Sequence, residues 1–144
     1  MESETDMAEG RVEIEIASPV KKVFDFVADV ETHPLYDGEF VESVKITSAK
    51  RRGKGMTFTQ VRRGSDKPSP SEIIEFAPNK KVVWVAHGAK GDVLVSYWFE
   101  KTPRGTRIVH AVSSTLLDDP ERLKLSYEEN TRELANLKKM MEED

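Results

Sequence analysis

Residues 119–143 predict one long amphipathic helix, and this helix most constrains the fold. Asp119 is a suitable N-cap residue, and Pro120 fits the first helical position, where its missing N–H costs nothing. About 24 residues at a rise of 1.5 Å give roughly 36 Å, enough to cross a small domain. The helix should bury an apolar stripe spaced at three, four or seven residues, formed by Leu123, Tyr127, Leu134, Leu137 and Met141.

Two polar residues, Asn130 and Thr131, interrupt this stripe. A dry core would leave their hydrogen-bonding groups unsatisfied, so one interpretation places them against a cavity. The other interpretation places them at the edge of the stripe, facing water. The charged residues of the helix, Glu133 among them, are predicted to lie mostly off the stripe.

The chain before Gly38 predicts one strand followed by one or two short helices. Residues 11–17 alternate between polar and apolar, which is typical of a half-buried strand. Ser18 and Pro19 are typical of a helix start, and residues 20–27 carry a short apolar stripe. Residues 33–38 then indicate a helical turn and a loop.

Six further strands are predicted before the last helix, with only short links between them. Short links require antiparallel pairing of consecutive strands. A sheet of seven strands and one long helix bury their apolar faces best when the sheet curls around the helix, which gives an α+β domain. The six strands are expected at residues 40–48, 56–63, 72–77, 81–87, 93–100 and 106–116.

Length and charge limit the organisation and the partners. The 144 residues fit a single domain, expected at 11–144 behind a flexible tail at 1–10. A net charge of −4 gives no general case for binding nucleic acid, and no apolar run is long enough for an integral membrane segment. The tail has no secretion-signal pattern, so we expect a cytoplasmic protein.

Metal and cysteine chemistry have no support in the sequence. Cysteine is absent, and the histidines His33, His87 and His110 are too far apart for a spaced zinc motif. We therefore predict no metal and no cofactor.

Several stretches resemble polyketide cyclase/dehydrase-like proteins of the START and Bet v 1-like (SRPBCC) superfamily. The resemblance covers nearly the whole chain from Arg11 and implies a helix-grip fold, in which seven antiparallel strands hold the last helix around an apolar pocket. Members bind lipids, sterols, polyketides, plant hormones or quinones; some are cyclases or aromatases, and a related branch stimulates a chaperone ATPase. The stretches are residues 17–29, 33–37, 53–56, 76–84, 97–100 and 105–108.

Strand alternation selects the residues that face the concave side of the sheet. If Arg107 faces solvent, His110 faces inward. An even-length loop at Pro103 and Arg104 places Tyr97 opposite His110, whereas an odd loop places Trp98 there. His110 is the foremost candidate for an acid/base or hydrogen-bonding role. The predicted ligand-binding residues are His110, Tyr97, Trp84, Phe58, Gln60, Phe99, Asn130, Thr131 and Leu134.

Three other positions are less well determined. Glu72 faces inward in one phase of its strand and would then pair with His110, while Ile73 faces inward in the other phase. His87 is expected in a loop, and His33 either near the pocket mouth or on the surface.

The sequence as a whole predicts a protein that binds, transports or sequesters a small hydrophobic ligand such as a lipid, polyketide or quinone. It would act as a monomer or weak homodimer. One alternative is an enzyme of the polyketide cyclase or dehydratase kind that uses His110 and Tyr97. A second alternative is a protein-binding module resembling a chaperone ATPase activator.

Overall fold

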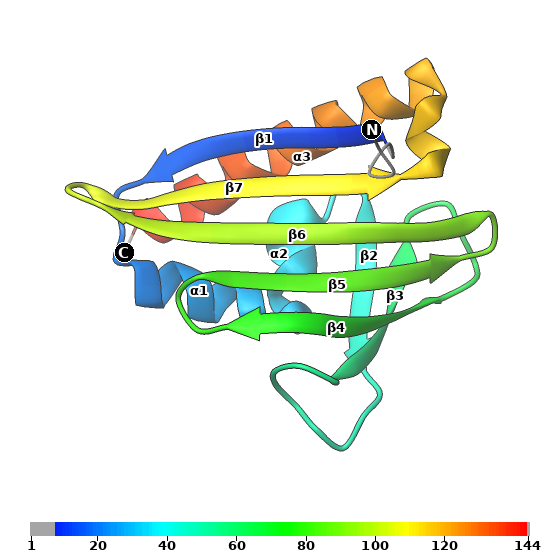
Figure 1. Cartoon of the computed structure of the whole chain (residues 1–144), viewed down its shortest axis with the longest axis horizontal. Coiled ribbons are helices and arrows are strands. Elements are labelled where there is room, and N and C mark those ends of the chain that lie inside the picture. The colour runs from blue at the N-terminus through cyan, green and yellow to red at the C-terminus, as the bar shows by residue number, and fades with distance from the viewer. Residues whose placement is uncertain (1–7, 144) are drawn as a thin grey trace, which may run out of the picture.

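The computed structural model describes residues 8–143, which form a curved antiparallel sheet backed by helices (Figure 1). The seven strands follow the order β1-β7-β6-β5-β4-β3-β2 across the sheet. This arrangement confirms the predicted α+β helix-grip architecture. The strands are β1 (Ala8–Ile16), β2 (Val41–Ile46), β3 (Thr57–Arg62), β4 (Ser69–Ala77), β5 (Lys81–Gly88), β6 (Gly91–Thr102) and β7 (Gly105–Ser114).

Five helical segments complete the described chain, and the α-helices lie behind the sheet in Figure 1. The last helix is the longest, as predicted, and the carboxylate of Asp119 caps it by accepting a 3.0 Å hydrogen bond from the N–H of Glu121. No helix within residues 8–143 is long and apolar enough to span a bilayer. The segments are α1 (Val20–Ala28), η1 (Val30–Thr32), α2 (His33–Asp37), η2 (Thr115–Asp118) and α3 (Pro120–Glu142).

Several predicted boundaries are wrong; β4, for example, starts at Ser69 and not at residue 72. The first strand starts at Ala8, so residues 8–10 belong to the sheet and not to the tail; the rest of the predicted tail lies outside the described residues. The N-cap of α1 is Pro19; within the described part of the chain, no side chain caps this helix and the buried hydroxyl of Ser18 has no partner. The last strand ends at Ser114, where the chain enters η2 instead of continuing to residue 116.

The helix α3 packs beside β1, at one edge of the sheet, because Gly10 removes a side chain from the contact. A Cβ atom at Gly10 would lie 2.9 Å from the hydroxyl of Ser126 and 3.4 Å from Nδ2 of Asn130. That Nδ2 atom donates a 3.0 Å hydrogen bond to the carbonyl oxygen of Gly10. The close approach of α3 to β1 leaves the concave side of β5, β6 and β7 partly uncovered by helix.

The buried stripe of α3 differs from the predicted one in its N-terminal half. Tyr127 is 53% exposed, and Leu123 is only partly buried. The buried residues follow helical spacing from Asn130 onward and include a glutamate: Asn130, Glu133, Leu134, Leu137 and Met141. The apolar anchors therefore lie in the C-terminal half of the helix, where they join the core against α1 and the sheet.

The hairpin between β6 and β7 supplies the first testable prediction. Gly105 has φ of 153°, and a Cβ atom there would overlap the carbonyl oxygen of Ile16 and lie 2.6 Å from the amide nitrogen of Ser18. Because both neighbours are backbone atoms, Gly105→Ala should lower the free energy of unfolding by about 2–4 kcal/mol in urea denaturation.

Gly64→Ala is the matched control. Gly64 also has positive φ, 85°, but a Cβ atom there meets nothing within 4 Å. Only the conformational cost of about 1 kcal/mol is then expected. Equal losses in the two variants would show that the contact with residues 16 and 18 does not constrain the hairpin.

Candidate ligand-binding site

A cavity of about 700 Å³ lies between the sheet and the N-terminal half of α3. Strands β5, β6 and β7 form its apolar wall, α2 and α3 supply most of its polar groups, and the β5–β6 hairpin and η2 form its rim. Its principal lining residues are His33, Asp37, Gln60, Arg62, Trp84, Ala86, Val93, Val95, Tyr97, His110, Val112, Leu116, Leu117, Leu125, Ser126, Glu129, Asn130 and Glu133.

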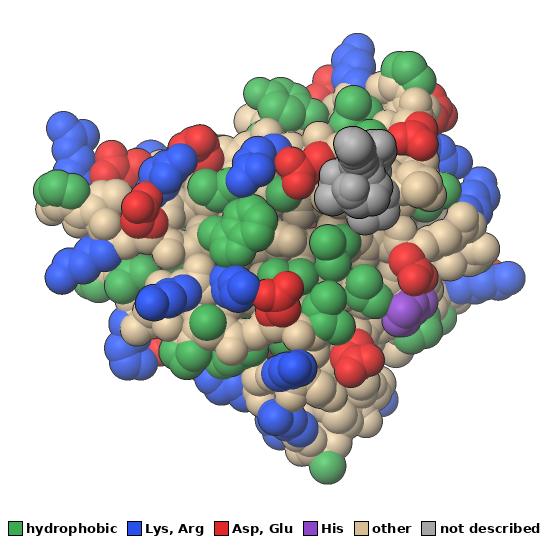
Figure 2. Space-filling view, in the orientation of Figure 1, with side chains coloured by type: hydrophobic (Ala, Val, Ile, Leu, Met, Phe, Trp, Pro, Cys, Tyr) green, Lys and Arg blue, Asp and Glu red, His purple; other side chains and the backbone are tan. Residues whose placement is uncertain are grey.

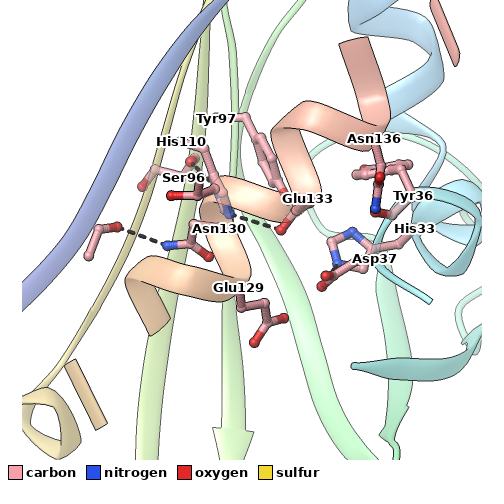
Figure 3. A network of polar contacts seen from close by, with 12 residues as sticks. His33, Tyr36, Asp37, Ser96, Tyr97, His110, Glu129, Asn130, Glu133 and Asn136 are labelled. Atoms are coloured by element: carbon pink, nitrogen blue, oxygen red, sulfur yellow. Dashed lines mark hydrogen bonds and ion pairs between the residues drawn. The ribbon is translucent and has the colours of Figure 1, made fainter. Parts of the chain in front are cut away.

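A buried polar network links α3 to the sheet at this cavity (Figure 3). Oε1 of Glu133 lies 3.2 Å from Nε2 of His110, and the hydroxyl of Tyr97 donates a hydrogen bond to Oε2 of Glu133. The Tyr97 and His110 rings stack with their centroids 4.0 Å apart and their planes at 4°. All three residues are at most 2% exposed. The network fixes both ring orientations and the carboxylate.

The hydrogen bonds of His110 define its protonation. Its Nδ1 lies 3.1 Å from the carbonyl oxygen of Ser96, which can only accept, so Nδ1 carries a proton. Burial acts to lower the pKa of His110, but the Glu133 carboxylate outweighs burial and raises the pKa above its ordinary value. Burial likewise acts to raise the pKa of Glu133, and His110 reverses the shift, so that this pKa is lowered. The two groups form a buried imidazolium–carboxylate pair.

A second buried pair, His33 with Asp37, lies on α2 at the same cavity. The residues are four apart and share one face of the helix, with Nε2 of His33 3.2 Å from Oδ2 of Asp37. Burial lowers the pKa of His33, whereas burial and the nearby Glu133 carboxylate raise the pKa of Asp37 far above its usual range. This pair is therefore neutral, an imidazole beside a carboxylic acid.

A third pair joins β3 to α3. The guanidinium of Arg62 contacts both carboxylate oxygens of Glu129, at 2.6 and 3.3 Å. The Glu129 side chain is 15% exposed and that of Arg62 is 45% exposed, so the pair extends from the cavity lining to solvent. Arg62 thus balances the charge of Glu129, which lies beside the two buried pairs.

Five of the nine predicted site residues line the cavity: His110, Tyr97, Trp84, Gln60 and Asn130. The two-residue loop of the β6–β7 hairpin pairs Tyr97 directly with His110, which confirms the even-loop interpretation. That these residues contact a ligand stays a prediction.

The other four predicted residues lie elsewhere. Phe58, Phe99 and Leu134 are buried in the hydrophobic core and are not part of the cavity lining. Thr131 is exposed, and its hydroxyl donates a 2.8 Å hydrogen bond to the carbonyl oxygen of Tyr127. Thr131 therefore faces water at the edge of the stripe, and only Asn130 faces the cavity. The two side chains differ because one helical step of about 100° separates them.

Sequence reasoning missed the acidic residues of the site. Glu133 was predicted off the stripe, although it stands four residues before the core residue Leu137, and the spacing alone signals its position. Ile73 faces inward and Glu72 is exposed, so the partner of His110 comes from the helix and not from β4. His33 is buried and lines the cavity, which agrees with the alternative that placed it by the pocket.

His87, by contrast, is exposed and pairs with Asp92 at 2.9 Å, near the turn of the β5–β6 hairpin. His87 was expected in a loop, but it lies near the end of β5, two residues before the turn.

The curved sheet and the edge-packed helix define a helix-grip fold, with a cavity between them. Several solved structures share this fold. The protein MLL2253 from Mesorhizobium loti has a TM-score of 0.74 and 16% identity, over 92% of this chain and 95% of that one. The Aha1 dimer from Colwellia psychrerythraea also has a TM-score of 0.74 and 16% identity, over 94% and 97% of the two chains.

The KanY protein is similar as well, with a TM-score of 0.73, 14% identity, and coverage of 94% of this chain and 98% of that one. Comparison with models of known protein families gives no match, and comparison with curated proteins gives none either. At these identities the likeness establishes the fold alone.

The buried network provides the second testable prediction. Replacing the carboxylate in Glu133→Gln leaves the imidazolium of His110 without its counter-charge in a buried site. We expect the free energy of unfolding to fall by about 3 kcal/mol, measured by chemical denaturation at neutral pH. The control is Glu128→Gln, an exposed position on the same helix, which should leave the denaturation midpoint nearly unchanged. Similar midpoints for the two variants would contradict the ion pair.

Proposed function

We propose that this protein binds a small, largely apolar molecule that carries at least one polar group, in the cavity between the sheet and α3. The single observation that supports this proposal is the 700 Å³ cavity with apolar strand residues on one side and the buried polar network at its end. Pockets for small organic ligands commonly measure about 300–1,000 Å³ and combine apolar walls with a few fixed polar groups.

The apolar wall would supply most of the affinity. Side chains of Ala86, Val93, Val95 and Val112 line the cavity from three adjacent strands. Burial of ligand surface against them releases roughly 25 cal/mol per Å² of apolar area, before the cost of association is subtracted. The wall has no directional preference, so it selects ligands by size and shape.

The polar residues would orient the ligand. His110 uses both ring nitrogens within the protein, and Asn130 uses its amide nitrogen on Gly10. Gln60, in contrast, lines the cavity and makes no side-chain hydrogen bond with any residue in the range 8–143. Gln60 is therefore the best-placed donor and acceptor for a polar group of the ligand.

Filling the cavity tests this proposal. Ala86→Trp places a large ring in the lining, and we expect it to weaken binding of an anilinonaphthalene sulfonate probe at least tenfold, about 1.4 kcal/mol, in a fluorescence titration. Native mass spectrometry of the purified wild-type protein, with extraction of any bound molecule, should identify the natural ligand class.

The matched control is Val85→Trp, one residue away on β5 and on the opposite face of the sheet, which should leave probe affinity unchanged. Wild-type protein that carries no molecule and takes up no probe would refute the binding function. Equal weakening by both variants would place the probe outside the cavity.

Acid–base catalysis of the cyclase or dehydratase kind is the second candidate, and the paired His110 and Glu133 favour it. Against it, both nitrogens of the imidazole are engaged, so proton transfer to a ligand requires breaking an existing contact. If catalysis occurs, His110→Ala should lower turnover of a polyketide-like substrate about 100-fold or more while probe binding persists. The conservative variant Tyr97→Phe keeps the stacked ring and removes only the hydroxyl. Turnover that matches wild type in both variants would remove the enzyme hypothesis.

A chaperone-activator-like module is the third candidate and has less support. That function calls for a filled core and a contiguous apolar surface patch. Apolar and charged side chains are interspersed on the outer face of the sheet (Figure 2). There Arg107 bridges Glu13 and Glu100, and the guanidinium of Arg11 lies 5.5 Å from the Trp98 ring. A pull-down that recovers a specific protein partner would support the chaperone-activator-like function.

A further inference from the structure

Three side chains with metal-binding atoms converge at the polar end of the cavity. We propose that His33, Asp37 and Glu133 form a binding site for a divalent transition-metal ion of the Zn²⁺ type. This inference goes beyond the binding of an apolar ligand and does not depend on it. Figure 3 shows the side chains of His33 and Asp37, on α2, near that of Glu133, on α3, whose carboxylate is joined by a dashed line to His110.

The geometry suits one ion. One nitrogen or oxygen atom from each of the three residues lies within 4.8 Å of the other two, and the three side chains are buried. Ligand atoms that share a metal at about 2.0–2.2 Å stand roughly 3–4 Å apart. Small side-chain rotations would therefore bring the three atoms to bonding distance. The four-residue spacing of His33 and Asp37 already places both on one face of α2.

The donor set fits a borderline metal ion. One imidazole nitrogen and two carboxylate oxygens are the ligand types found in catalytic zinc sites with three protein ligands. A metal needs a neutral imidazole, and His33 is buried beside the carboxyl group of Asp37. The remaining coordination positions would face the cavity, because all three residues line it.

Among residues 8–143, two polar atoms beside these ligands have no hydrogen-bond partner: Nδ1 of His33 and the hydroxyl of Tyr36. The rings of these residues are in contact, with centroids 5.1 Å apart, and both residues are at least nine-tenths buried. Buried polar atoms without partners are uncommon, and a bound ion is one way to satisfy them. A metal ion with a coordinated water would provide hydrogen-bond partners for these two atoms.

The groups around the three ligands carry no net positive charge. His110 pairs with Glu133, and Arg62 pairs with Glu129. A divalent ion between the carboxyl groups of Asp37 and Glu133 would supply a counter-charge for both. Hydrogen bonds from Tyr97 and His110 would hold the Glu133 ligand in position from outside the coordination shell.

Calorimetric titration of the full chain with Zn²⁺, after removal of metal by a chelator, tests the site. We expect one ion per chain. Asp37→Asn and His33→Gln should each weaken binding at least 100-fold, since even residues outside the coordination shell change metal affinity by about 10–100-fold. The control His87→Gln alters an exposed histidine that also pairs with an aspartate, and it should leave the affinity unchanged.

X-ray absorption spectroscopy of the Zn²⁺-loaded wild type gives a readout that does not depend on how well the variants fold. It should show one imidazole nitrogen and at least two oxygens at about 2.0–2.2 Å. Absence of Zn²⁺ binding by the wild type, absence of an imidazole ligand, or affinity that depends on His87 would each overturn the proposal. Probe uptake by the metal-free protein separates this result from the ligand-binding function, because the apolar wall contains none of the three ligands.

Discussion

The contact between α3 and β1 determines the position of everything else in the site. One helix is too narrow to cover a curved sheet of seven strands, so where it rests decides which strands stay open. Gly10 leaves room for the side chains of Ser126 and Asn130 against the edge strand, and the hydrogen bond from Asn130 fixes the approach. The concave side of β5, β6 and β7 then faces a cavity instead of a packed helix.

A helix at this position brings polar side chains into the interior, and the fold compensates them in pairs. Glu133 enters at a core position of α3 and is balanced by His110, while Asp37 is held neutral beside His33. Replacing such groups by apolar residues of similar size commonly preserves or increases stability. Their presence next to a cavity is the feature on which the proposed recognition of a polar group or an ion depends.

The pattern of the sequence was sufficient for the architecture, but it left two alternatives for the faces of β4 and β6. Alternation along β6 and β7 correctly turned Tyr97 and His110 inward, because a pleated strand has a strict period of two. The buried face of the last helix was harder to predict. The stripe of α3 was drawn through Tyr127, which is exposed, and Glu133 was left off it because charged residues are mostly found at the surface. The buried counter-charge of Glu133 lies on another element, β7. No local sequence pattern encodes a pairing between a helix and a strand.

The two tryptophans of the chain stand on opposite faces of the sheet. Trp84 belongs to the cavity wall and is 3% exposed, whereas Trp98 is 37% exposed on the outer face beneath Arg11. The protein thus carries one intrinsic fluorophore in the cavity wall and a second one outside the cavity. Emission from Trp84 would respond to occupancy of the cavity, and emission from Trp98 would serve as an internal reference in the same spectrum.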